Sequence, residues 1–267
     1  MTTHTEIQLK DDSLILFETN EHGVGTLTLN RPEKYNAFTK DMIIRWHRIL
    51  ADAADDPKVK VIVLTGAGKA FCTGGDIGAQ KDRANNDSLE RKDFLYRHVH
   101  KIAFVMEQMD KPTIAAINGT ARGAGLDMAL MCDLRIMANT ATLAESYINV
   151  GLIAGDGGTY YLPRLIGVPR ALELFWTGRV VESAEAERIG MVNSVVAPDQ
   201  LMPAAHDLAA RIAKQPFEAI RAYKRSVYQG MSMNLSTHLD MVSSHTSILR
   251  DTPEHRDRVA AFLQRKK

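Results

Sequence analysis

The sequence of 267 residues is poor in cysteine, in net charge and in long apolar runs. Its two cysteines, Cys72 and Cys132, are typical of a reduced protein and not of a disulfide framework, so we expect a cytoplasmic location. A formal net charge of +1 provides no broad basic field, which argues against nucleic acid or an anionic membrane as partner. No apolar run has the length of a membrane span or of a signal-peptide core, so we expect neither.

The content of the sequence favours an α/β protein with a sizeable core. Hydrophobic residues make up 45% of the chain, enough for one α/β domain with a helical appendage. The segments 14–17 and 24–29 predict a hairpin, and 39–54 predicts a helix that begins at Thr39. The near-continuous apolar run at 59–65 is typical of a strand buried in a mostly parallel sheet.

The central motif lies at 113–133 and reads TIAAINGTARGAGLDMALMCD. It predicts a strand, a tight turn and a helix whose first residues are small, so that a ligand oxygen can approach the free backbone N–H groups. Asp127 falls about one turn into this helix. Close packing of a strand on a helix would also explain the glycines. A dinucleotide fingerprint is disfavoured, because Met128 stands where that motif needs Gly or Ala.

A second glycine-rich loop lies upstream at 66–77 and reads GAGKAFCTGGDI. It also follows an apolar strand and places two glycines before an acid. Two such loops can each contribute one backbone N–H to a single oxygen, which is the geometry of an oxyanion hole.

Four stretches together resemble the enoyl-CoA hydratase/isomerase (crotonase) superfamily. They are AFCTGGDI, AAINGTARGAGLDMALMCD, the earlier LNRPEKYNAF, and a basic tail that contains Phe262. The resemblance covers roughly residues 14–267. It implies a crotonase-like ββα spiral core at 1–198 and a C-terminal helical trimerisation region at 199–267, assembled as a homotrimer or homohexamer.

The resemblance also implies an acyl-CoA thioester substrate. Gly75 and Ala124 match the positions whose N–H groups form the oxyanion hole. Contacts to coenzyme A are implied for Lys34, Ala37, Thr73, Asp76, Ile77, Phe262 and Arg265. A solvated lysine at position 34 and a plain amphipathic tail at 262–265 would show the same pattern. No metal and no cofactor is implied beyond the coenzyme A that is part of the substrate.

The acidic residues depart from the hydratase pattern of the family. Hydratases position the attacking water with two glutamates, which match Asp127 and Tyr147 in this sequence. Asp127 is a shorter acid that can still serve, but Tyr147, with an ordinary pKa of about 10, is no base near neutral pH. Asp156 resembles an active-site aspartate of dienoyl-CoA isomerases and crotonase-fold dehalogenases. It can equally be the N-cap of the helix that follows.

Other candidate side chains have less support. Glu145 is a rival carboxylate on the same face of an extended stretch as Tyr147, and a structural role is favoured. The segment 77–90 is polar and predicts a mobile loop, followed by a helix at 89–110. His98 and His100 on that helix do not share one face and have no further ligand at metal spacing, so we interpret them as solvated or packed.

The sequence therefore predicts an acyl-CoA-processing enzyme that stabilises a thioester enolate and moves protons with carboxylates. A dienoyl-CoA isomerase-like activity and a crotonase-fold hydrolase, acting on a thioester or opening a ring at a C–C bond, remain open. So does a non-enzymatic relative that binds acyl-CoA or RNA, although the acids at 127 and 156 disfavour it.

Overall fold

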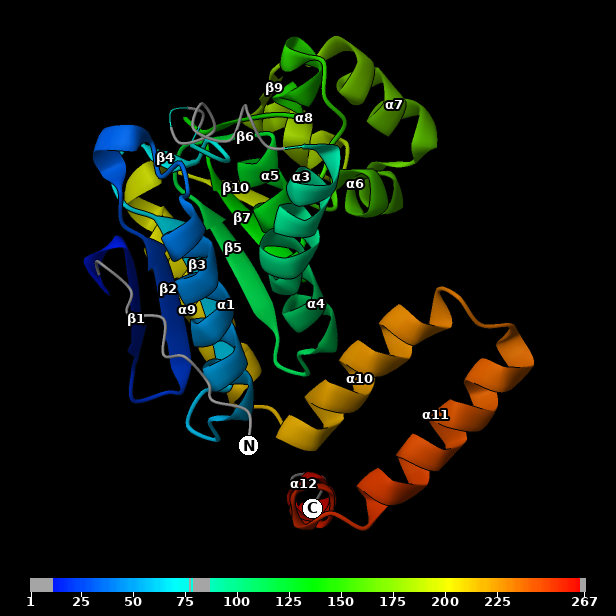
Figure 1. Ribbon diagram of the computed structural model, residues 1–267. Coiled ribbons are helices and arrows are strands. Elements are labelled where there is room, and N and C mark those ends of the chain that lie inside the picture. Colours follow the sequence, from blue (N-terminus) through cyan, green and yellow to red (C-terminus); the bar gives the residue numbers. More distant parts are fainter. Residues whose placement is uncertain (1–11, 77, 79–86, 265–267) are drawn as a thin grey trace, which may run out of the picture.

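A computed structural model describes residues 12–76, 78 and 87–264 (Figure 1). Two predicted site residues, Ile77 and Arg265, lie outside the described residues, as does most of the loop predicted at 77–90.

The strands confirm the α/β class. They are β1 (Ile15–Thr19), β2 (Val24–Leu29), β3 (Val61–Gly66), β4 (Ala70–Cys72), β5 (Thr113–Ile117), β6 (Thr120–Arg122), β7 (Leu134–Ala138), β8 (Thr142–Ala144), β9 (Val181–Glu182) and β10 (Ser194–Val196). Among the described residues they form a six-stranded sheet in the order β1-β2-β3-β5-β7-β10 and a four-stranded sheet in the order β4-β6-β8-β9. β1 and β2 form the predicted antiparallel hairpin, while β2, β3, β5, β7 and β10 pair in parallel.

The helices cover both faces of the larger sheet. They are α1 (Lys40–Asp55), α3 (Ser88–Phe94), α4 (His100–Gln108), α5 (Ala124–Leu130), α6 (Gly158–Ile166), α7 (Val168–Thr177), α8 (Ser183–Arg188), α9 (Leu201–Ala213), α10 (Phe217–Gly230), α11 (Leu235–Arg250) and α12 (Pro253–Gln264). In Figure 1, α1 lies in front of the sheet and α9 behind it. None of the helices in the described ranges combines the length and apolar composition that a bilayer crossing requires.

Local sequence explains why these elements form. The Thr39 side chain accepts a hydrogen bond from the Met42 N–H and caps α1, as predicted, and α1 buries Met42, Trp46 and Leu50 against the sheet. β3 and β5 are buried along their whole length, which is why they read as continuous apolar runs. The predicted helix at 89–110 is divided by a π-helical turn, Leu95–Val99, between α3 and α4.

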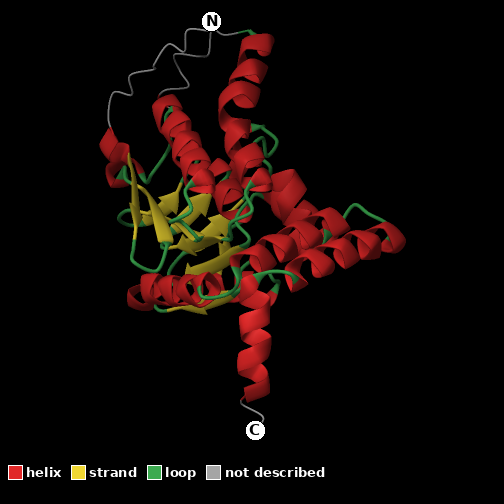
Figure 2. Cartoon of the chain, turned by 90° about the horizontal axis from the view of Figure 1, so that it is seen from below, coloured by secondary structure: helices red, strands yellow, loops and turns green. Residues whose placement is uncertain are grey.

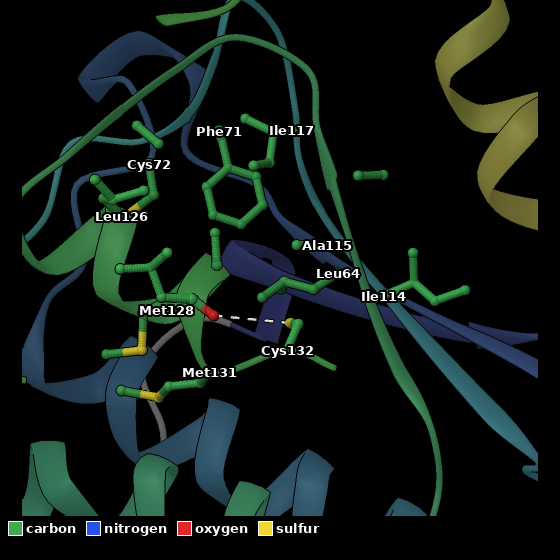
Figure 3. Packing of buried hydrophobic residues seen from close by; sticks show 14 of the residues in the cluster. Leu64, Phe71, Cys72, Ile114, Ala115, Ile117, Leu126, Met128, Met131 and Cys132 are labelled. Atoms are coloured by element: carbon green, nitrogen blue, oxygen red, sulfur yellow. Dashed lines mark hydrogen bonds between the residues drawn. The ribbon is translucent and has the colours of Figure 1, made fainter. Parts of the chain in front are cut away.

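The core lies between the sheet and α1, α4 and α5. Figure 3 shows Leu126, Met128 and Met131 of this cluster together with Phe71 and with Ile114 and Ala115 of β5. A cavity of about 10 Å³ remains in this part of the core. That is about the space of one water molecule, so it is a packing gap and not a ligand site.

The helices α10, α11 and α12 extend away from the sheet, and we call them the C-terminal arm. Figure 2 shows them projecting from the strand layer. Ion pairs attach α10 to the core, with Arg221 on Asp110 at 2.7 Å and Lys224 on Asp133 at 2.8 Å. α9 lies beyond the predicted boundary at 198/199, yet it packs on the sheet through Leu201, Ala205 and Ala209. The division at 198/199 stays a prediction.

Candidate active site

The two glycine-rich loops lie against each other at the ends of β4 and β6, which pair in parallel. Gly74 has φ +88°, and a Cβ there would lie 3.5 Å from the Ala124 backbone nitrogen. A Cβ on Gly125 would lie 2.1 Å from the Cys72 carbonyl oxygen. Only glycine permits this approach, so the loops must stay glycine-rich to meet.

Two backbone N–H groups at this contact have no acceptor within the described residues. Gly74 donates to Cys72 Sγ and Gly123 donates to the Ala144 carbonyl, whereas those of Gly75 and Ala124 donate to no described group. Ala124 is the first residue of α5, so its N–H lies outside the helical hydrogen bonds. These are the two residues that the sequence predicts for an oxyanion hole.

Asp127, Tyr147 and Asp156 come together beside these loops. Asp127 lies in the first turn of α5, Tyr147 in the 3₁₀ segment Ser146–Val150, and Asp156 in the turn before α6. The Tyr147 hydroxyl is 2.8 Å from Asp127 Oδ2 and 3.1 Å from Asp156 Oδ2. The Asp156 N–H also donates to Asp127 Oδ2, at 3.2 Å. Three residues that are separate in the sequence therefore form one hydrogen-bonded cluster.

Asp156 does not cap the helix that follows it. Gly157 is the N-cap of α6, with φ +117° and no side-chain hydrogen bond, and the Asp156 carboxyl points to Tyr147 instead. The alternative interpretation as a helix cap is therefore wrong.

Glu145 adds a third carboxyl to the cluster. Its side chain is buried, and Oε1 lies near Asp127: a Cβ on Gly158 would lie 2.3 Å from Asp127 Oδ1 and 3.0 Å from Glu145 Oε1.

 The carboxyls of Asp127 and Glu145 thus face each other across Gly158, where no larger residue fits. From the sequence we expected Glu145 on the same face as Tyr147. No pattern indicated its contact with Asp127, because the 3₁₀ segment interrupts the strand alternation.

Burial and mutual repulsion keep protons on this cluster. Burial, followed by the charge of Asp156, raises the pKa of Asp127 to about 7, against hydrogen bonds from Tyr147. Burial and then the charge of Asp127 raise the pKa of Glu145 to about 10. Burial also raises the pKa of Asp156. The pKa of Tyr147 is raised by burial and by the carboxyls around it, so its hydroxyl stays a neutral donor.

His100 supports the turn that carries Asp156. Its Nε2 donates to the Gly155 carbonyl oxygen at 2.8 Å, and its ring packs edge-on to Tyr96 and Phe104. His98 packs on the Phe94 ring at 5.3 Å between centroids. The interpretation of both histidines as packed side chains is confirmed, although the sequence did not indicate that His100 would contact the Asp156 turn.

Four of the residues predicted to contact coenzyme A lie around the junction of the 31–38 and 73–76 segments, namely Lys34, Ala37, Thr73 and Asp76. Arg31 joins the two segments, because its Nη1 donates to the Ala37 carbonyl at 2.9 Å and to Asp76 Oδ2 at 2.7 Å. Thr73 contacts the Tyr35 carbonyl, and Lys34 is exposed. Arg31 was not singled out from the sequence.

Asn36 holds this junction in shape and was also missed. It is fully buried with φ +57°, a conformation that side chains other than Asn and Asp rarely adopt. Its amide donates to the carbonyls of Ala67, Ala70 and Phe71, and its oxygen accepts from the Arg31 N–H. The partners lie up to 35 residues away in the sequence, so no local pattern reveals them.

Phe262 lies far from these loops within the chain. It is 57% exposed on α12, and Figure 1 shows α12 at the opposite end of the molecule from β4 and α5. A contact between Phe262 and this chain's own site is therefore not formed, and a contact to a neighbouring subunit stays a prediction.

The fold and the site together define an α/β protein in which glycine-rich loops adjoin a buried group of acids. The family model for enoyl-CoA hydratase/isomerase matches residues 19–267. The chain belongs to the enoyl-CoA hydratase/isomerase family.

Individual relatives in this family carry different activities. A crotonyl-CoA hydratase of Syntrophomonas wolfei is 34% identical, over 92% of this chain and 94% of that protein. A 1,2-epoxyphenylacetyl-CoA isomerase of Escherichia coli is 32% identical, over 92% of this chain and 94% of that protein. The crystal structure of an enoyl-CoA hydratase from Mycobacterium smegmatis matches with a TM-score of 0.88 at 31% identity, covering 94% of this chain and 96% of that one.

Proposed function

We propose that this protein is an acyl-CoA-processing enzyme that stabilises a thioester enolate and transfers protons with carboxylates. The observation that carries the proposal is the cluster of Asp127, Tyr147 and Asp156 next to the N–H groups of Gly75 and Ala124, which donate to no described group. Two N–H donors aimed at one thioester oxygen would stabilise the negative charge that develops on it. The adjacent carboxyls would take up and return the carbon-bound proton.

Proton transfer between carbons is favoured over addition of water. By the family resemblance, Tyr147 stands where hydratases carry their second glutamate. Its raised pKa keeps it a neutral donor to the two aspartates. It would therefore orient Asp127 and Asp156 and not deprotonate a water molecule. The name of the isomerase relative is in line with this choice, but the name of the hydratase relative leaves simple hydration as the outcome to exclude.

Coenzyme A enters the proposal only as part of the substrate. Lys34, Ala37, Thr73 and Asp76 would line its path, with the Arg31–Asp76 ion pair fixing the loop. No metal and no redox cofactor takes part in the proposed step. A cytoplasmic location is part of the same proposal, and the two cysteines, buried and free, are consistent with it.

We also propose that the chain assembles as a homotrimer or homohexamer through the C-terminal arm. Apolar side chains gather on the arm, and Tyr223, Val227, Leu235, Leu239 and Ile248 are each more than half exposed. Such a surface is costly to leave in water and is typical of an interface. In the assembly, Phe262 would reach a neighbouring subunit.

A panel of acyl-CoA esters tests the proposed reaction. The protein is incubated with enoyl-, dienoyl- and cyclic oxoacyl-CoA esters in deuterated water, and the products are identified by mass. We expect a shifted double bond or an exchanged hydrogen with at least one ester, and slow hydration of crotonyl-CoA. Release of free coenzyme A without isomerisation would instead indicate a hydrolase, and no change in any ester would count against an enzyme.

A further inference from the structure

Glu145 is a buried carboxyl that the proposed reaction does not use. The residue is 1% exposed, and neither of its oxygens has a hydrogen-bond donor within the described residues. An ionised carboxylate in that position would lose its hydration without compensation by hydrogen bonds. The position of Glu145 therefore disfavours the ionised form of its carboxyl.

One oxygen of Asp127 also lacks a hydrogen-bond donor among the described residues. Asp127 Oδ2 receives the Tyr147 hydroxyl and the Asp156 N–H, whereas Oδ1 is buried and has no described donor. Asp127 Oδ1 and Glu145 Oε1 both approach the same point above Gly158. Two facing carboxylates are acceptors only, so one proton on Glu145 neutralises that carboxyl and supplies the missing donor to Asp127 Oδ1.

We propose that Glu145 is a positioning residue, protonated at neutral pH, whose O–H donates to Asp127 Oδ1. The proton lies on Glu145 and not on Asp127 because Asp127 already accepts two hydrogen bonds on its other oxygen, which favour its charged form. Asp127 is then ionised, and both of its carboxylate oxygens accept hydrogen bonds. Glu145 touches no substrate and acts only through Asp127.

The charges around Glu145 are consistent with this assignment. Asp127 on α5 and Asp156 in the turn before α6 repel an ionised Glu145, Tyr147 is a neutral hydroxyl, and His100 faces Asp156 from α4. Burial followed by these charges raises the pKa of Glu145 to about 10, above the value of about 7 for Asp127. The order of these two pKa values agrees with a proton on Glu145.

Two substitutions separate a proton donor from a base. A glutamine at position 145 keeps an N–H that can donate to Asp127, whereas a leucine of similar size cannot. We expect Glu145→Gln to keep kcat within about threefold and Glu145→Leu to lower kcat about 10- to 100-fold, as expected for a lost hydrogen bond to a charged group, with KM little changed. A general base at position 145 would instead make Glu145→Gln lose about 10²- to 10⁴-fold.

Infrared spectroscopy tests the protonation without any substrate. The full chain, with glutamate side chains labelled by ¹³C, is compared with Glu145→Gln and with Glu18→Gln, a control at an exposed strand position. At about pH 8 we expect a protonated-carboxyl band that shifts with the label, persists in Glu18→Gln and is lost in Glu145→Gln. Absence of that band in the native protein, or its survival in Glu145→Gln, would overturn the proposal.

The turnover arm rests on the proposed function, whereas the infrared arm does not. If no acyl-CoA ester is turned over but the band behaves as expected, the proposed function fails and the protonated Glu145 stands. If turnover is found and the band is missing, the assignment of Glu145 fails and the proposed function stands.

Discussion

Helix α5 and the C-terminal arm differ completely in burial. Every residue of α5 is buried, and Asp127 lies in the middle of that helix. None of the described residues of α10, α11 and α12 is buried. Both regions are helical and carry apolar side chains, but within the described residues α5 is covered on all sides, whereas the arm is held by contacts that leave its apolar side chains exposed.

The two regions therefore place different constraints on their sequences. Residues around α5 must fit neighbours that the same chain provides, so their replacement should change folding stability and chemistry. Exposed residues on the C-terminal arm would be covered by another chain in the assembly. Their replacement should therefore change assembly and leave the fold intact.

Asn36 should give the largest loss of stability. Asn36→Ala removes the amide that donates to three carbonyls and places alanine at φ +57°. Because each buried group left without a partner costs about 1–3 kcal/mol, we expect a loss of about 3 kcal/mol or more in denaturant unfolding. The control is Tyr35→Asn, which keeps φ +50° at an exposed position and should be neutral or slightly stabilising. Equal losses for the two variants would contradict the account of Asn36.

Gly158→Ala should follow, at about 1–3 kcal/mol, with a loss of turnover. The added Cβ would lie 2.3 Å from Asp127 Oδ1, so the carboxyls on both sides of it must move. The matched control is Gly155→Ala, whose Cβ would meet only the Ile153 carbonyl oxygen at 3.8 Å. Thermal unfolding and turnover of the two variants are compared. A Gly158→Ala protein as stable and active as Gly155→Ala would refute the close contact.

The fold was largely predictable from the sequence, and the acid cluster was only partly so. The hairpin, the Thr39-capped helix and the buried β3 and β5 follow from apolar runs and local capping, which act over a few residues. Asp127 was singled out by its position about one turn into the helix that follows the glycine-rich turn, whereas Asp156 was selected through the family resemblance. Glu145 and Asn36 could not be assigned, because their environments are made by segments distant in the sequence.

Stability should fall as the pH rises, because the native state keeps carboxyl protons that the unfolded chain releases. Unfolded carboxyls have pKa values of about 4, whereas the native values are about 7 for Asp127 and about 10 for Glu145. Their contribution is complete below about pH 4 and is lost as the pH rises through the native values. We expect the melting temperature to fall between about pH 5 and pH 9, with a smaller slope in Glu145→Gln. A slope equal to that of the native protein would contradict the shifted pKa of Glu145.

Substitution on the C-terminal arm should have the smallest effect on folding. Leu239 is 53% exposed on α11, so Leu239→Ser should change the unfolding free energy of the separated chain by no more than about 0.5 kcal/mol. It should weaken the oligomer, as measured by analytical ultracentrifugation. An exposed polar position, Ser243→Ala, is the control for the helix itself. An unchanged sedimentation profile for Leu239→Ser would remove this face of α11 from the proposed interface.

The central claim is that Asp156 moves a proton beside a thioester enolate. Hydrogen exchange into the substrate from deuterated water, measured by mass spectrometry, is compared between the native protein and Asp156→Asn, together with crotonyl-CoA hydration. We predict slow hydration by the native protein and a fall in exchange of about 10²- to 10⁴-fold in Asp156→Asn. The loss of thermal stability should be smaller than that of a lost helix cap, because Asp156 caps no helix and the asparagine oxygen can still accept from Tyr147. Fast crotonyl-CoA hydration that Asp156→Asn leaves unchanged would contradict it.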